Sequence, residues 1–128
     1  MTIEHVAIWT DRLETMREFY TEYFGGSPGG KYRNPSTGFE SYFVAFGAGA
    51  RLEIMQKPSI IPQPEPAKEH QGYAHLAFSV GGRELVDALS QKLDEDGYRV
   101  TSRPRETGDG YYESCILDPD GNRVEITE

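Results

Sequence analysis

Two histidines and two glutamates recur at matching places in this sequence, and both residue types bind divalent metal ions. His5 begins a His-Val-Ala-Ile segment, and His75 begins a His-Leu-Ala-Phe segment 70 residues further on. Glu53 lies in an Arg-Leu-Glu-Ile segment, and Glu125 lies in an Arg-Val-Glu-Ile segment 72 residues further on. Recurrence in unchanged order at a nearly constant spacing indicates an internal duplication. We therefore expect His5, Glu53, His75 and Glu125 to form one metal site.

The ligand types indicate which ion and which chemistry to expect. Imidazole nitrogen and carboxylate oxygen together suit one divalent ion of the first transition row, Ni²⁺, Zn²⁺, Co²⁺, Mn²⁺ or Fe²⁺. The single cysteine, Cys115, cannot build a structural zinc site of several thiolates. Four protein ligands on a six-coordinate ion leave two positions for adjacent oxygens of a substrate. The ion would then act as a Lewis acid, and a carboxylate such as Glu125 or Glu53 would act as general base.

Two copies of one arrangement of strands and a helix are predicted to position these residues. Each copy begins with a strand rich in β-branched residues, continues with an amphipathic helix and ends with three strands. The expected elements of the first copy are strand 2–9, helix 12–24 and strands 31–34, 40–47 and 50–56. Those of the second copy are strand 73–80, helix 82–96 and strands 98–103, 111–117 and 122–127. Thr10 or Asp11 is expected to cap the first helix, and Gly25 is expected to end it.

The helices are predicted to bury one apolar face each. In the first helix this face consists of Leu13, Met16, Tyr20, Tyr23 and Phe24. In the second helix it consists of Leu85, Val86, Leu89 and Leu93. Between these landmarks the pair Glu40-Ser41 matches Glu113-Ser114, which we take as a further sign of duplication.

Alternation of side chains along the strands predicts where the four ligands point. On the strand of His5 the opposite face carries Val6 and Ile8, and Leu52 and Ile54 flank Glu53 in the same way. The second copy repeats this pattern. Since the aliphatic faces suit packing against the helices, we expect all four ligands to project from the other side of curled sheets, where a cleft would form.

A proline-rich segment separates the two copies. Residues 58–71 contain four of the eight prolines and read as a semi-extended linker. The expected modules are therefore residues 1–57 and 72–128, together one structural domain. The third histidine, His70, lies in this linker and is not expected to be a ligand.

Composition limits the classes of function. The chain has 128 residues, enough for one domain, and a net charge of −8, which argues against binding to nucleic acid. No apolar run is long enough to span a bilayer, and the N-terminus shows no signal peptide, so we expect a cytoplasmic protein that does not bind membranes. Small-molecule chemistry, a protein partner or a small binding module is left.

The sequence resembles the vicinal oxygen chelate superfamily, and most closely its small glyoxalase-I-like members. The motifs that carry the resemblance are His5-Val6-Ala7-Ile8, Arg51-Leu52-Glu53-Ile54, Gly72-Tyr73-Ala74-His75-Leu76-Ala77 and Asp118-Pro119-Asp120-Gly121-Asn122-Arg123-Val124-Glu125, with Met16-Arg17-Glu18-Phe19-Tyr20 in the first helix. The resemblance covers nearly the whole chain. It implies an α+β fold of paired βαβββ modules, the glyoxalase/bleomycin-resistance/dioxygenase-like fold, with metal ligands in the order His, Glu, His, Glu.

The resemblance also implies an activity, that of a lactoylglutathione lyase. Glyoxalase I converts a hemithioacetal into a thioester by moving a proton between adjacent carbons through an enediolate. Carried over to this chain, Glu125 is the expected shuttle base and Glu53 shares that role. One departure is Trp9, which stands where bacterial glyoxalase I enzymes usually carry an arginine that holds the glutathione carboxylate. The expected substrate-binding residues are Trp9, Arg51, Met55, Tyr111, Tyr112 and Arg123.

Other activities of the same scaffold remain open. The chain could be an epimerase or thiol transferase, or a non-catalytic binding or resistance protein that sequesters a small molecule. A homodimer is expected, because the family builds its cleft from two modules within one chain or across two chains.

Overall fold

The computed structural model describes residues 1–62, 68–69 and 71–128. The chain divides into two compact units, Met1–Pro64 and Glu65–Glu128. The predicted linker 58–71 lies partly outside the described residues, because 63–67 and 70 are among those not described, and His70 is therefore not described either.

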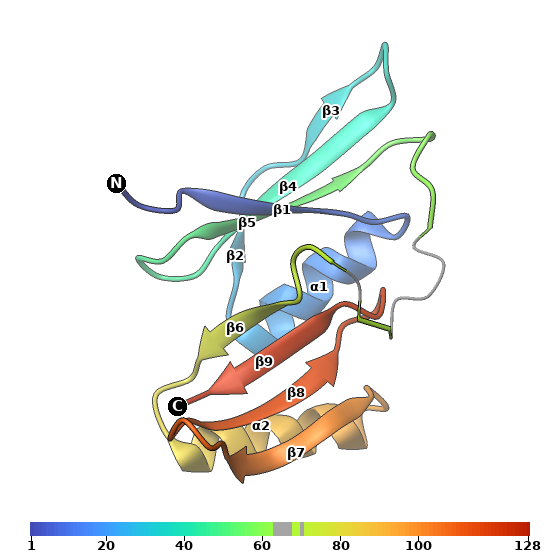
Figure 1. The fold of residues 1–128 in the computed structure, drawn as a ribbon. Helices are drawn as coiled ribbons and strands as arrows, with labels where there is room; N and C mark the ends of the chain where they lie inside the picture. The colour runs from blue at the N-terminus through green and yellow to red at the C-terminus, as the bar shows by residue number, and fades with distance from the viewer. Residues whose placement is uncertain (63–67, 70) are drawn as a thin grey trace. The chain divides into compact units, whose positions relative to one another are not determined.

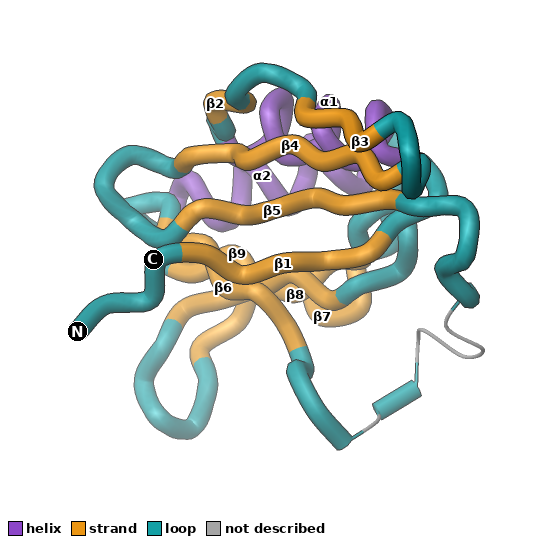
Figure 2. Tube along the Cα trace, turned by 90° about the horizontal axis from the view of Figure 1, so that it is seen from above, coloured by secondary structure: helices purple, strands orange, loops and turns teal. Residues whose placement is uncertain are grey.

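The first unit is a mixed sheet with one helix packed against it. Its elements are β1 (His5–Trp9), α1 (Leu13–Phe24), β2 (Ser27–Pro28), β3 (Tyr32–Asn34), β4 (Phe39–Ala45) and β5 (Arg51–Gln56). The strand order is β1-β5-β4-β2, and β3 also pairs with β4 (Figures 1 and 2). β1 runs parallel to β5, whereas β4 is antiparallel to β5, β2 and β3. The first and last strands of the unit are therefore neighbours.

The second unit repeats this path. Its elements are β6 (His75–Ser79), α2 (Arg83–Glu95), β7 (Val100–Glu106), β8 (Tyr112–Leu117) and β9 (Arg123–Thr127). The strand order is β6-β9-β8-β7, with β6 parallel to β9 and the other pairs antiparallel (Figure 1). The predicted α+β fold of two βαβββ modules is confirmed. Each sheet is open rather than closed into a barrel.

The sequence did not predict β2. This strand has two residues, Ser27 and Pro28, which pair with Ala45 and Val44. Proline cannot donate to a ladder and is confined to sheet edges, where this strand lies. A two-residue edge strand that contains proline has no hydrophobic alternation to reveal it.

Each helix covers the face of its sheet that carries the aliphatic residues. The buried residues of α1 are Leu13, Met16, Phe19 and Tyr20. Phe19 was not predicted to be buried, and the predicted Tyr23 and Phe24 are only half-buried. In α2 the buried residues are Val86, Ser90 and Leu93. The prediction was wrong for Leu85, which is 54% exposed because it lies at the flank of a face centred on these three residues.

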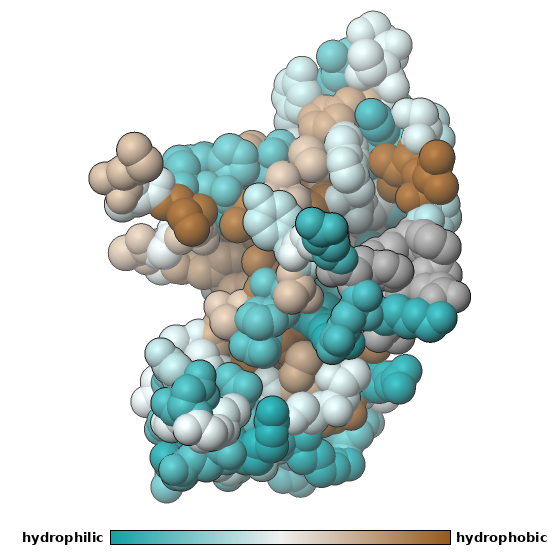
Figure 3. Space-filling view, viewed as in Figure 1, coloured by the Kyte–Doolittle hydropathy of each residue, from teal (hydrophilic) through white to brown (hydrophobic). Residues whose placement is uncertain are grey.

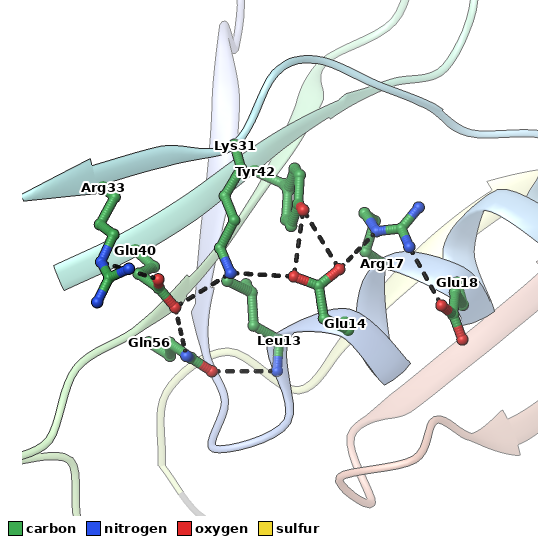
Figure 4. Close-up of polar contacts among 9 residues, drawn as sticks. All are labelled: Leu13, Glu14, Arg17, Glu18, Lys31, Arg33, Glu40, Tyr42 and Gln56. Carbon is green, nitrogen blue, oxygen red and sulfur yellow. Dashed lines mark hydrogen bonds and ion pairs between the residues drawn. The ribbon is translucent and has the colours of Figure 1, made fainter. Parts of the chain in front are cut away.

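The start of α1 is held by tertiary contacts rather than by the predicted cap. The N-cap residue is Arg12, and it makes no side-chain cap bond. Instead, the Leu13 backbone N–H donates to the Gln56 side chain of β5 at 3.2 Å (Figure 4). Thr10 accepts from the Arg12 backbone N–H at 3.0 Å. The predicted end of the helix is confirmed, since Gly25 is left-handed with φ of 65°.

A charged network joins the same helix end to the neighbouring strands. Glu14 accepts from Lys31 and Arg17, both at 3.1 Å, and from the Tyr42 hydroxyl (Figure 4). Lys31 also pairs with Glu40 at 3.2 Å. Burial raises the pKa of the Glu14 carboxyl, but these hydrogen bonds outweigh it and hold the pKa below its usual value.

The strand pairing corrects one detail of the internal repeat. Phe43 of β4 pairs with Glu53, and Cys115 of β8 pairs with Glu125. These pairs place Ser41 in register with Glu113, so the Glu-Ser match in the sequence is displaced by one residue. Because side chains alternate, a displacement of one residue exchanges the two faces of the strand.

The surface carries apolar as well as charged side chains. Brown apolar residues lie among teal polar ones on the visible part of the first unit (Figure 3). Exposed large apolar residues of that unit include Ile3, Trp9, Tyr32 and Ile61. No helix in the described part of the chain is long and apolar enough to cross a membrane.

Candidate metal-binding pairs

The parallel pairing of β1 with β5 brings the first predicted ligands together. His5 pairs with Arg51, and Ala7 pairs with Glu53, so the His5 and Glu53 side chains lie diagonally on one face. Leu52 and Ile54 on either side of Glu53 are buried against the helix side. The Nε2 atom of His5 lies 3.9 Å from Oε2 of Glu53.

The second unit builds the same pair by the same pairing. His75 pairs with Arg123 and Ala77 pairs with Glu125, which again sets imidazole and carboxylate diagonally on the open face. The Nε2 atom of His75 lies 3.1 Å from Oε2 of Glu125. Equal register in both units explains why the same residue types recur at the same strand positions.

Both pairs are accessible to a ligand, and they are exposed in the same pattern. The imidazoles are 41% exposed in His5 and 40% in His75, whereas the carboxylates are 16% exposed in Glu53 and 23% in Glu125. The glutamates are held close to the sheet and the imidazoles extend toward solvent. In both pairs the Nε2 atom faces the carboxylate, so a nitrogen and an oxygen donor are presented together.

The other nitrogen of His5 has a partner of its own. The Glu4 carboxylate contacts His5 Nδ1, and its second oxygen accepts from the Arg51 guanidinium. The hydrogen bond with His5, followed by that with Arg51, holds the pKa of Glu4 below its usual value. A carboxylate on Nδ1 fixes the orientation of an imidazole and leaves Nε2 free to bind a metal. Ala74 stands at the corresponding place in the second unit.

The donor set fits a divalent ion, although each unit supplies only part of it. Each pair offers one imidazole nitrogen and one carboxylate oxygen, which suits Ni²⁺, Zn²⁺, Co²⁺, Mn²⁺ or Fe²⁺. Within residues 1–62, 68–69 and 71–128, no group of three or more His, Cys, Asp or Glu residues is arranged to hold a metal ion. The structure therefore presents the ligands as two pairs, and a four-ligand centre stays a prediction.

The predicted substrate-binding residues of the first unit lie on the face of Glu53. Trp9 pairs with Met55 one step along the strands from Glu53. Trp9 is 46% exposed. Arg51 shares this face, where it binds Glu4 and stacks on the Phe43 ring with 4.3 Å between guanidinium and ring centre.

The predicted residues of the second unit divide between the two faces. Arg123 is on the face of Glu125, and its guanidinium donates to Glu69 at 3.2 Å. Tyr111 lies in the turn before β8 and is 57% exposed. Tyr112 was predicted to bind substrate, but the structure places it on the face opposite Glu125. Its hydroxyl donates to Asp87 of α2 at 2.7 Å, and Arg83 of α2 lies over its ring, so the side chain lies on the helix side.

Three neighbours of the predicted ligands were missed from the sequence. Phe43 contacts the His5 ring edge-on, with 5.3 Å between ring centres. Cys115 pairs with Glu125 and is half-buried beside it. Glu4 holds His5 and Arg51 as described above. Phe43 and Cys115 are the direct pairing partners of Glu53 and Glu125, so they could be identified only once the strand register was known.

Comparison with known proteins agrees with the fold. The family model of the Glyoxalase/Bleomycin resistance protein/Dioxygenase superfamily matches residues 2–126. The protein named Uncharacterized protein YqjT of Bacillus subtilis (strain 168) is 30% identical over 127 residues, which cover 97% of this chain and 96% of that relative.

Two solved structures illustrate the likeness. A glyoxalase family protein from Enterococcus faecalis is 28% identical with a TM-score of 0.78, over 98% of this chain and 96% of that chain. The trypanothione-dependent glyoxalase I of Leishmania major shares the fold, with 21% identity and a TM-score of 0.78 over 100% of this chain and 86% of that chain. By its sequence and its two repeated units, this chain belongs to the Glyoxalase/Bleomycin resistance protein/Dioxygenase superfamily, also known as the vicinal oxygen chelate superfamily.

Proposed function

We propose that this protein is a metal-dependent lyase or isomerase of the glyoxalase I type. His5, Glu53, His75 and Glu125 would hold one divalent ion, contributed as two pairs from one chain or from two copies in a homodimer. The single observation that carries the proposal is the recurrence of a His–Glu pair, with Nε2 facing the carboxylate, at register-equivalent positions of both units. A fold alone needs no such repetition of polar residues on an open sheet face.

The roles of the residues follow from their chemistry. A bound divalent ion would supply Lewis acidity toward two adjacent oxygens of a small substrate. Glu125 would take a proton from the carbon next to a carbonyl and return it to the adjacent carbon, and Glu53 would share this work. Glu4 would orient His5 through Nδ1. Trp9 and Met55 would contact the substrate beside Glu53.

The likeness to the glyoxalase I of Leishmania major supports this chemistry at the level of the fold. The substrate does not transfer in the same way, because Trp9 stands where the resemblance predicts an arginine for the glutathione carboxylate. We therefore propose hemithioacetals of a 2-oxoaldehyde as substrates and leave the choice of thiol to experiment.

The test combines metal analysis with turnover. The purified protein should bind Ni²⁺, Co²⁺ or Zn²⁺ in proportion to its sites and convert methylglyoxal hemithioacetals of common thiols into thioesters, followed by absorbance. Glu125→Gln should lower kcat by about a hundredfold or more, because removal of a general base costs that factor. Glu113→Gln is the matched control, since Glu113 shares the open face but is not a predicted ligand.

Two results would contradict the proposal. A protein that binds no divalent metal, by elemental analysis and by thermal shift, would be a non-catalytic binder instead. A protein that binds metal but turns over no hemithioacetal would refute the lyase activity and favour an epimerase or a thiol transferase.

A further inference from the structure

One row of residues differs between the two units although the ligand positions are the same. In the first unit the row next to Glu53 runs from Trp9 through Met55 and Ser41 to Tyr32, each paired with the next across four strands. Trp9, Met55 and Ser41 each lie two residues along their strands from Ala7, Glu53 and Phe43, and Tyr32 pairs with Ser41, so all four side chains are on the open face.

Aromatic side chains gather along this row. Phe39 contacts both Trp9 and Tyr32 edge-on or tilted, with ring centres 6.1 Å and 6.0 Å apart. Trp9 and Tyr32 are nevertheless 46% and 56% exposed. We call Trp9, Tyr32, Phe39 and Met55 the aromatic surface. Large apolar side chains grouped at the surface beside polar residues mark binding sites.

In the second unit only the position equivalent to Phe39 is aromatic, where Tyr111 stands, and the row itself carries no aromatic residue. The row next to Glu125 runs from Ser79 through Thr127 and Glu113 to Arg105. These residues are polar or charged, and the unit folds into the same sheet. The fold therefore does not require aromatic residues in this row, so their presence in the first unit needs another reason.

A cation lies beside the aromatic surface. The Lys57 ammonium is 4.8 Å from the centre of the Trp9 ring. In the described part of the chain it contacts this ring and no carboxylate. The protein has a net charge of −8, so a lysine that contacts no carboxylate among the described residues stands out. It is placed to pair with an anionic group of a ligand whose flat part rests on the aromatic residues.

We propose that the aromatic surface binds the aryl group of a small aromatic carboxylate and that Lys57 pairs with the carboxylate. The proposal rests on the proposed function in one respect, since it assigns this surface to the substrate of the site that contains Glu53. The substrate of the proposed function would then carry an aryl group and a carboxylate in its thiol part, in place of the peptide thiol that an arginine at position 9 would select. Trp9, Tyr32 and Lys57 would thus set specificity without taking part in proton transfer.

The test uses the metal-free full chain and the fluorescence of Trp9, which is the only tryptophan. The protein is titrated separately with phenylacetate, with acetate, which lacks the ring, and with benzyl alcohol, which lacks the charge. Phenylacetate should change the emission saturably and bind several-fold tighter than either, because acetate loses the stacking contact and benzyl alcohol loses the exposed ion pair.

Variants assign the contacts. Tyr32→Ala should weaken phenylacetate binding several-fold, and Lys57→Gln should weaken phenylacetate binding while leaving benzyl alcohol unchanged. Tyr73→Ala is the matched control, because Tyr73 is an exposed tyrosine of the other unit, before β6. It should leave both ligands unaffected.

Three outcomes would overturn the inference. Phenylacetate could bind no tighter than acetate, or give no saturable response up to tens of millimolar. Trp9 could be shielded from acrylamide in the free protein and become accessible only on dilution, which would show that a second copy covers the surface. Since no metal is present, these results are independent of turnover: an inactive enzyme that binds phenylacetate would refute only the lyase activity.

Discussion

Substitution of two adjacent residues of β9 should lower the free energy of unfolding by very different amounts, since the two side chains lie on opposite faces of the sheet. Ile126 is fully buried on the helix side, and Ile126→Ala should lower the free energy of unfolding by about 2–5 kcal/mol through lost burial and the cavity left behind. Glu125 lies on the open face, and its partner His75 is 40% exposed. Glu125→Ala should therefore change the free energy of unfolding of the metal-free protein by less than about 1 kcal/mol.

Zn²⁺ should stabilise the two variants to different extents. At a Zn²⁺ concentration a hundred times its Kd, the wild-type protein and Ile126→Ala should each gain about 2.7 kcal/mol. If loss of one ligand weakens binding about a hundredfold, Glu125→Ala should gain only about 0.4 kcal/mol at the same concentration. The variant that is more stable without zinc thus gains least from it.

Urea titrations followed by circular dichroism, with and without Zn²⁺, measure all these values. The first unit supplies an internal replicate, because Ile54 is fully buried and follows Glu53 as Ile126 follows Glu125. A cost for Glu125→Ala equal to that of Ile126→Ala without metal would show that the faces are assigned wrongly. Full zinc stabilisation of both Glu125→Ala and Glu53→Ala would show that these glutamates are not ligands.

Three further substitutions test other contacts. Gly26→Ala should destabilise by about 1–3 kcal/mol in thermal or urea unfolding, because the new Cβ would lie 2.4 Å from the Val44 side chain. Glu14 contributes stability that is present above its unfolded pKa near 4.5 and is lost as pH falls through its lowered folded pKa; Glu14→Gln should flatten the acid limb of stability measured against pH. Glu4→Gln should weaken Zn²⁺ binding by about tenfold in a calorimetric titration and change the tautomer populations of His5 seen by NMR, whereas unchanged values would show that Glu4 does not orient the ring.

Much of the fold could be predicted from the spacing of apolar residues and from the glycines that end the helices. Both helices lie within one or two residues of the predicted ranges, because a 3.6-residue apolar period ends at Gly25 and at Gly97. Alternation in the strands correctly placed His5 and Glu53 opposite the aliphatic face. These features depend on neighbours in the sequence, which is why the sequence reveals them.

The predictions from sequence were wrong where contacts between residues far apart in the chain determine the structure. Tyr112 was predicted to bind substrate, yet one step of register separates it from the face of Glu125, and its hydroxyl donates to Asp87 of α2. The start of α1 is satisfied by Gln56, 43 residues away, so no local capping pattern could show it. Leu85 fits the helical period as well as Val86 does, and only packing against the sheet distinguishes them.

The two units agree at the predicted ligand positions and differ in the row beside them. The histidines recur after 70 residues and the glutamates after 72, so two residues have been inserted between them in the second unit. Both histidines still pair with an arginine two residues before the glutamate, which means that the insertion falls outside the pairing strands. A shift of one residue within a strand would turn either predicted ligand to the helix side, so the register is constrained on the strands that carry them.

The neighbouring row carries no such constraint from the predicted ligands. There the first unit has Trp9 paired with Met55, and the second unit has Ser79 paired with Thr127. Differences in substrate choice among proteins built this way should therefore be sought one row from the ligands rather than at them.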